Sequence, residues 1–263
     1  MKNSKFLAIL HFLILAVVIW WNYYINSGSI DGKTVGAVSD KFSTLFTPAA
    51  YAFSIWRVIY LLLTCYAVYL IKIAFSNNED EEVVLKSAPW LILAHLGSAS
   101  WLWFWLQEST GISVIVMIVI MLSLIVAILK LNMERWDAPL PTLAFVWWPI
   151  DLYAGWISVA LVANVSAHLT GIGWDGGLKE SSWVIIMIAI VSVIHILMIQ
   201  KRNMREFAAV AIWAFIAIAV KHWDGLQFLS WTAIFASIII GAVAARHAYL
   251  NRATLPFIRK DNV

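Results

Sequence analysis

The stretch from Phe46 to Leu63, FTPAAYAFSIWRVIYLLL, places one arginine inside a long apolar segment. Arg57 follows Trp56, lies nine positions after Pro48 and precedes a run of aliphatic residues. The core of a soluble protein rarely buries an unpaired arginine, and the interior of a bilayer tolerates one even less readily. The solvent around this segment must therefore be established from the rest of the chain.

The composition indicates a membrane protein. Of the 263 residues, 62% are hydrophobic and 13% are charged, whereas an ordinary soluble domain has about 45–50% apolar and about 25% charged residues. Sixteen residues are tryptophan. The single cysteine, Cys65, excludes an internal disulfide and offers no metal-binding motif. We expect no nucleic-acid partner.

Eight apolar runs are long enough, or nearly so, for the roughly 20 residues that a membrane-spanning helix needs. They are Phe6–Ile25, Tyr51–Phe75, Pro89–Leu106, Ile112–Lys130, Leu143–Ser166, Ser182–Gln200, Phe207–Lys221 and Phe228–Tyr249. Polar connections rich in Gly, Pro, Asn and Asp separate them. The sequence therefore predicts an all-α, polytopic integral membrane bundle of about eight transmembrane helices.

The basic residues favour one orientation of this bundle. With eight spans and the N-terminus in the cytoplasm, thirteen of the eighteen Lys and Arg residues lie on the inner side and four on the outer side, with Arg57 inside a span. Such a bias follows the positive-inside rule. The prediction is a bacterial inner-membrane protein with both termini cytoplasmic.

Aromatic residues gather near the predicted outer ends of the spans. They could form an interfacial belt, because indole rings favour the headgroup level, and this interpretation stays open. Trp101 and Trp105, however, are four residues apart and share one helix face, while Trp103 points elsewhere. An aromatic wall of this kind suits a flat apolar ligand oriented by a few polar groups.

Two motifs point to a known family. The segment TPAAYAFSIWRVIY resembles the second helix of the tryptophan-rich sensory protein family, also called the translocator protein or peripheral-type benzodiazepine receptor family. LYAGWISVALVAN, which ends at Asn164, is similar to its fifth helix, with Tyr153 and Trp156 at the family's spacing. In the third helix Trp101 fits, but Ser98 replaces the family's Asn.

The resemblance extends from about Phe6 to His168. It implies a long-form member, with a five-helix family-like core over residues 1–170. A three-helix extension over residues 171–263 would pack in the same bundle.

The family binds tetrapyrroles such as porphyrins, and some members bind sterols. The resemblance and the aromatic pattern together imply an outer-half ligand pocket lined by Tyr51, Phe53, Trp56, Tyr60, Trp101, Trp105, Tyr153, Trp156 and Asn164. The expected function is binding or sensing of a flat apolar ligand, such as a tetrapyrrole or a lipid. The expected partners are the bilayer and this small ligand; a homodimer is compatible. No cofactor is required, although a bound tetrapyrrole would fit.

Two other functions stay open. The protein could be a secondary transporter of such a ligand or of a small solute, using the charges of Arg57 and Asp151. It could instead be a membrane enzyme that modifies a bound porphyrin or lipid, although no catalytic set of residues is recognisable and we expect no enzyme.

Helix rise predicts that Arg57 and Asp151 form an intramembrane charge pair. Counted from Pro48, Arg57 lies about 13 Å below the outer surface. Counted from Leu143, Asp151 lies about 12 Å from the inner face of a core about 30 Å thick. If the fifth helix began at Pro149 instead, Asp151 would lie at the inner surface, out of reach.

Three histidines, His11, His95 and His195, fall at similar depths, roughly 7–11 Å from the inner face. If they converge, they could bind a metal or haem iron or relay protons. They lack the short spacing of a metal motif, and a lone histidine is often simply buried. We therefore predict no metal site.

Overall fold

The computed structural model describes residues 2–76 and 81–252, and the described chain is helical, without strands. The long helices are α1 (Lys2–Asn26), α3 (Ile55–Phe75), α4 (Glu81–Leu106), α5 (Thr110–Lys130), α7 (Trp148–Gly171), α8 (Glu180–Arg202), α9 (Arg205–His222) and α10 (Gln227–Leu250). The shorter elements are α2 (Val35–Lys41), the 3-10 helix η1 (Ala50–Ser54), α6 (Leu140–Thr142) and the π-helix η2 (Leu143–Trp147).

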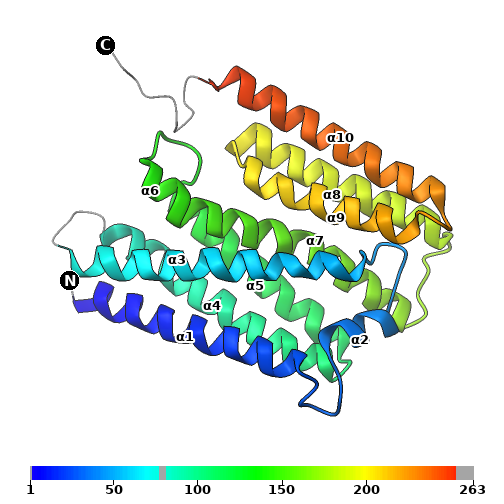
Figure 1. Ribbon diagram of the computed structural model, residues 1–263, viewed down its shortest axis with the longest axis horizontal. Coiled ribbons are helices and arrows are strands. Elements are labelled where there is room, and N and C mark those ends of the chain that lie inside the picture. The colour runs from blue at the N-terminus through cyan, green and yellow to red at the C-terminus, as the bar shows by residue number, and fades with distance from the viewer. Residues whose placement is uncertain (1, 77–80, 253–263) are drawn as a thin grey trace.

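The long helices lie side by side and alternate in direction (Figure 1). The start of α1 and the end of α10 lie at one end of the bundle, which we call the terminal end. The short helix α2 lies at the opposite end, which we call the α2 end.

Six helical stretches among the described residues are long and apolar enough to cross a membrane. They are Asn3–Asn26, Ala50–Phe75, Thr110–Lys130, Leu140–Gly171, Glu180–Arg202 and Gln227–Leu250. Helices α4 and α9 also run along the bundle but are not among these six stretches. The predicted helical membrane bundle is confirmed, whereas the count of eight spans stays a prediction.

One continuous core runs through both parts of the chain. Helices α1, α3, α4, α5 and α7 pack against one another, α8, α9 and α10 form a second group, and α7 joins the two by packing on α9. Gly155 permits this close approach, because a Cβ atom there would lie 2.7 Å from the backbone oxygen of Phe207.

The helical stretch that contains Asp151 is continuous from Leu140 to Gly171. Its second turn is the π-helix η2, which ends just before Pro149. In a regular helix the ring of Pro149 would clash with the carbonyl of Phe145, so a widened turn is placed where strain would otherwise arise. The helix therefore begins well before Pro149, and Asp151 lies inside it.

Candidate functional site

A cavity of about 560 Å³ opens at the α2 end, between α1, α3, α4 and α5. Its volume falls within the range of roughly 300–1,000 Å³ that small-molecule sites occupy. Its lining includes Phe53, Trp56, Arg57, Tyr60 and Trp101.

A smaller apolar pocket of about 60 Å³ continues inward between α2, α4, α5 and α7. It shares Phe53, Trp56 and Trp101 with the wider cavity. Its other walls include Trp105, Trp156 and Asn164. We call the two spaces together the aromatic cavity.

Seven of the nine residues that the sequence assigned to a ligand pocket line the aromatic cavity. They are Phe53, Trp56, Tyr60, Trp101, Trp105, Trp156 and Asn164. Tyr51 lies outside it, with its ring edge-on to Trp213 at 5.4 Å between centroids. Tyr153 is buried behind the wall, where its hydroxyl hydrogen-bonds Ser98 Oγ at 2.6 Å.

The aromatic rings form ordered walls. Trp101 and Trp105 stack with centroids 5.6 Å apart and planes 17° from parallel, as their spacing predicted. Trp56 stacks on Tyr60 at 5.2 Å and meets Tyr153 at 5.9 Å. The structure therefore presents flat apolar faces from α3 and α4 to one space.

Two buried donors have no hydrogen-bond partner at this cavity. Asn164 is 3% exposed; its Oδ1 accepts a hydrogen bond from Ser113 Oγ at 3.1 Å, while its Nδ2 is unpartnered. The indole nitrogen Nε1 of Trp101 is also buried and unpartnered. By contrast, Trp105 Nε1 donates to the carbonyl oxygen of Val35 at 3.2 Å. Unsatisfied donors beside an apolar space suit the hydrogen-bond acceptors of a ligand.

Helix α2 was not predicted, although it contributes Val35 to the wall of the cavity. A signal was present, since Thr34 is a favoured N-cap residue and its side chain accepts a hydrogen bond from Ala37 N at 3.1 Å. Lys33 and Lys41 both form ion pairs with Glu108, which follows the end of α4. Hydrogen bonds from Lys41 and then Lys33 lower the pKa of Glu108.

The predicted charge pair between Arg57 and Asp151 is not formed. Helix α3 begins only at Ile55, seven residues after Pro48, so Arg57 lies in its first turn and is exposed to the wide part of the aromatic cavity. Asp151 is fully buried, and neither of its carboxylate oxygens has a hydrogen-bond partner.

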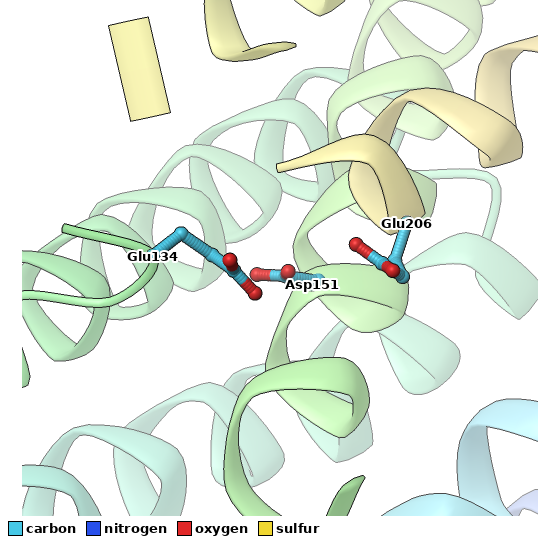
Figure 2. Close-up of side chains that lie close together, drawn as sticks. All are labelled: Glu134, Asp151 and Glu206. Atoms are coloured by element: carbon cyan, nitrogen blue, oxygen red, sulfur yellow. The ribbon is translucent and has the colours of Figure 1, made fainter. Parts of the chain in front are cut away.

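Asp151 lies instead with two acidic residues that sequence reasoning did not select, Glu134 and Glu206 (Figure 2). One carboxylate oxygen from each lies within 4.8 Å of the others. Burial, followed by repulsion from Glu206, raises the pKa of Glu134 to about 8, although Arg205 acts in the opposite direction. No local motif could have found this group, because the three residues come from separate elements.

The three histidines do not form one cluster. His11 and His95 do converge, with 3.2 Å between their Nε2 atoms. His195 instead contacts α7, where its Nε2 is 3.0 Å from Ser158 Oγ. Two buried imidazoles that hydrogen-bond each other leave no three-ligand site for a metal, and the groups of three or more ligands found in residues 2–76 and 81–252 include none of these histidines.

The apolar helices and the aromatic cavity define an integral membrane protein with a space suited to a small ligand. The chain matches the model of the TSPO-like protein family over residues 8–246, and it belongs to this family. The match confirms the resemblance and extends it beyond His168 through most of α10. No curated protein and no solved structure matches the chain.

Proposed function

We propose that the protein binds a flat, largely apolar ligand in the aromatic cavity, as a sensory or ligand-binding protein of the membrane. A tetrapyrrole is the ligand class that the family resemblance favours, and a lipid is the alternative. The ring walls of Trp56 with Tyr60 and of Trp101 with Trp105 would pack on the faces of such a molecule.

The pair of unpartnered donors, Trp101 Nε1 and Asn164 Nδ2, carries this proposal. A buried polar group without a partner costs roughly 1–3 kcal/mol, and both groups adjoin the same space. An acceptor on the ligand would remove this cost when it binds. The exposed guanidinium of Arg57 at the wide part of the cavity would attract an anionic substituent, such as a carboxylate.

The distribution of basic residues supports an orientation with the terminal end in the cytoplasm. The aromatic cavity would then open toward the outer half of the bilayer. In a bacterium, an orientation with the terminal end in the cytoplasm would correspond to a protein of the inner membrane.

The experiment is a titration of the purified, detergent-solubilised protein with protoporphyrin IX, followed by tryptophan fluorescence. We expect saturable quenching. Trp101→Phe and Asn164→Ala should each weaken binding about two- to tenfold, the cost of one neutral hydrogen bond. Trp156→Ala removes part of the wall and should weaken binding at least tenfold, about 1.4 kcal/mol.

Trp103→Phe is the matched control, because Trp103 lies on the same helix but is 43% exposed and does not line the cavity. Its affinity should equal that of the wild type. Unchanged affinity in the Trp101, Trp156 and Asn164 variants would reject this site. Quenching without saturation would reject specific binding of this ligand class.

The transporter alternative loses the charge pair on which it rested, since Arg57 and Asp151 form no contact within ion-pair distance. Ligand flux in reconstituted liposomes would restore it. Binding without flux is the outcome that a sensory role requires.

A further inference from the structure

The group of Glu134, Asp151 and Glu206 gathers three carboxylates at the terminal end of the bundle (Figure 2). Glu134 lies in the connection after α5, Asp151 in α7 and Glu206 in the first turn of α9. A cluster of acidic residues on a surface would need no explanation, because water would solvate each charge. Here the middle residue is fully buried.

Among the described residues, Arg205 is a nearby positive charge that lowers the pKa of Glu134, but it forms no ion pair with the group. Both oxygens of Asp151 lack a hydrogen-bond partner. Within residues 2–76 and 81–252, no ion pair includes Glu134, Asp151 or Glu206. A buried carboxylate that is neither paired nor hydrogen-bonded is strongly disfavoured, so these oxygens require either a bound cation or protons.

The spacing of the oxygens suits a single cation. Two oxygens that both lie 2.3–2.6 Å from one calcium ion can be at most about 4.6–5.2 Å apart. The three carboxylates lie within 4.8 Å of one another. For magnesium, with ligands at 2.0–2.1 Å, the limit is tighter, about 4.2 Å.

A cavity of about 500 Å³ leads to the group and is lined by Glu134 and Glu206. It provides a path for an ion and room for the water molecules that complete the coordination of a hard cation. Asn203 restrains the backbone of Glu134, because its Nδ2 donates to the carbonyl oxygen of Glu134 at 2.6 Å. Its Oδ1 is in turn 3.0 Å from His247 Nε2.

We propose that Glu134, Asp151 and Glu206 form a binding site for one hard divalent cation, which joins the α5–α6 connection to α7 and α9. The ligand set consists of oxygen atoms only, which favours calcium, manganese or magnesium over zinc or copper. The site is separate from the aromatic cavity and does not depend on the ligand proposed there.

The test measures thermal unfolding of the full-length protein in detergent after treatment with a chelator. Calcium, manganese or magnesium chloride is then titrated. We expect calcium or manganese to raise Tm by about 5–10 °C at a concentration a hundredfold above Kd. Calorimetric titration or manganese paramagnetic resonance should give one site per chain.

Asp151→Asn should abolish the metal-dependent rise in Tm and weaken binding at least tenfold. The same variant should unfold at the same temperature as the metal-free wild type or higher, because it removes an unpaired buried charge. Glu206→Gln serves as a second variant if Asp151→Asn fails to fold. Glu82→Gln is the matched control, since Glu82 is an exposed carboxylate that pairs with Lys86 and should leave the metal response intact.

A wild-type Tm that does not respond to any of the three cations would overturn the proposal and indicate that protons neutralise the group. An equal response in the wild type and both variants would place the cation elsewhere. Either result leaves the ligand titration at the aromatic cavity unaffected, so the two proposals fail separately.

Discussion

At the scale of single residues, buried polar groups fall into two kinds. Some form a hydrogen bond with a neighbouring helix: the hydroxyl of Tyr153 bonds that of Ser98, and the Tyr66 hydroxyl donates to Ser87 Oγ at 2.6 Å. Others, such as Asn164 Nδ2 and the oxygens of Asp151, have no partner. Asn164 lines the aromatic cavity, whereas Asp151 lies with Glu134 and Glu206, which line a cavity at the opposite end of the bundle. Because unsatisfied groups are costly in the absence of a ligand, their positions are the residue-level argument for two binding sites.

Gly155 provides a residue-scale test of the packing between α7 and α9. A methyl group at this position would lie 2.7 Å from the carbonyl oxygen of Phe207 and 3.1 Å from Val210 Cγ2. Backbone cannot yield as a flexible side chain would, so Gly155→Ala should destabilise the protein by about 1–3 kcal/mol, the usual cost of overpacking. Thermal unfolding in detergent measures this loss.

Gly241→Ala in α10 is the control, because the nearest atom to an added Cβ there is 3.8 Å away. Replacing a helical glycine without a clash should stabilise by roughly 0.5–1 kcal/mol. If the two variants shift Tm by the same amount in the same direction, α7 and α9 do not approach as closely as the structure shows.

At the scale of elements, α2 is too short to be stable by itself, since isolated helices under about 12–15 residues are marginal in water. Tertiary contacts hold it in place. Val35 and Val38 are buried, Thr34 caps its first turn, and Lys33 and Lys41 reach Glu108. Helix α2 is therefore a covering element of the aromatic cavity that is attached at a few identifiable points.

Glu108→Gln should loosen this attachment. Exposed ion pairs contribute little to stability, so we expect almost no change in Tm but faster hydrogen exchange at the amides of α2. Glu82→Gln, which breaks an exposed pair with Lys86 on the same helix, is the control and should leave α2 exchange unchanged. Unaltered exchange in the Glu108 variant would show that burial and capping alone hold α2.

Acidification should have the same effect as the Glu108 substitution. The two lysines lower the pKa of Glu108 from its ordinary value of 4.5. The ion pairs are therefore intact above pH 4.5 and are lost as the pH falls through the lowered value. After correction for the intrinsic pH dependence of amide exchange, the protection of the α2 amides should fall over that acidic range in the wild type and stay constant in Glu108→Gln.

The elements also show which features could be predicted from the sequence. Apolar runs and the spacing of Trp101 and Trp105 are local signals, and they predicted the helices and one cavity wall. The exposure of Arg57 to the aromatic cavity could not be predicted, because this cavity forms only where α1, α3, α4 and α5 pack together. The acidic group was missed because Glu134, in the α5–α6 connection, and Glu206, in α9, approach Asp151 of α7 only in the folded bundle.

At the scale of the whole molecule, α7 is common to both proposed sites. It contributes Trp156 and Asn164 to the aromatic cavity and Asp151 to the acidic group. Asp151 and Asn164 lie about 20 Å apart along the helix axis at 1.5 Å per residue. The family match over residues 8–246 includes both the five helices that surround the aromatic cavity and most of the three that follow. The family match therefore includes most of both predicted parts, while their division at residue 170 stays a prediction.

The number of spans and the orientation of the bundle are the last prediction, and α4 and α9 decide it. Both run between the two ends of the bundle (Figure 1), although neither is among the six stretches that are long and apolar enough to span a membrane by composition. If both cross the bilayer with the terminal end in the cytoplasm, Ser76 and Lys201 lie inside, and Ser109 and Asp224 lie outside.

Single cysteines at these positions, in a Cys65→Ser background, can be labelled in intact cells with a membrane-impermeant maleimide. The two outer positions should react directly and the two inner ones only after permeabilisation. Labelling of Ser76 and Ser109 from the same side would remove α4 as a span, and the same result for Lys201 and Asp224 would remove α9. Direct labelling at the inner pair, with protection of the outer pair, would keep eight spans but reverse the orientation, and the aromatic cavity would then open toward the cytoplasm.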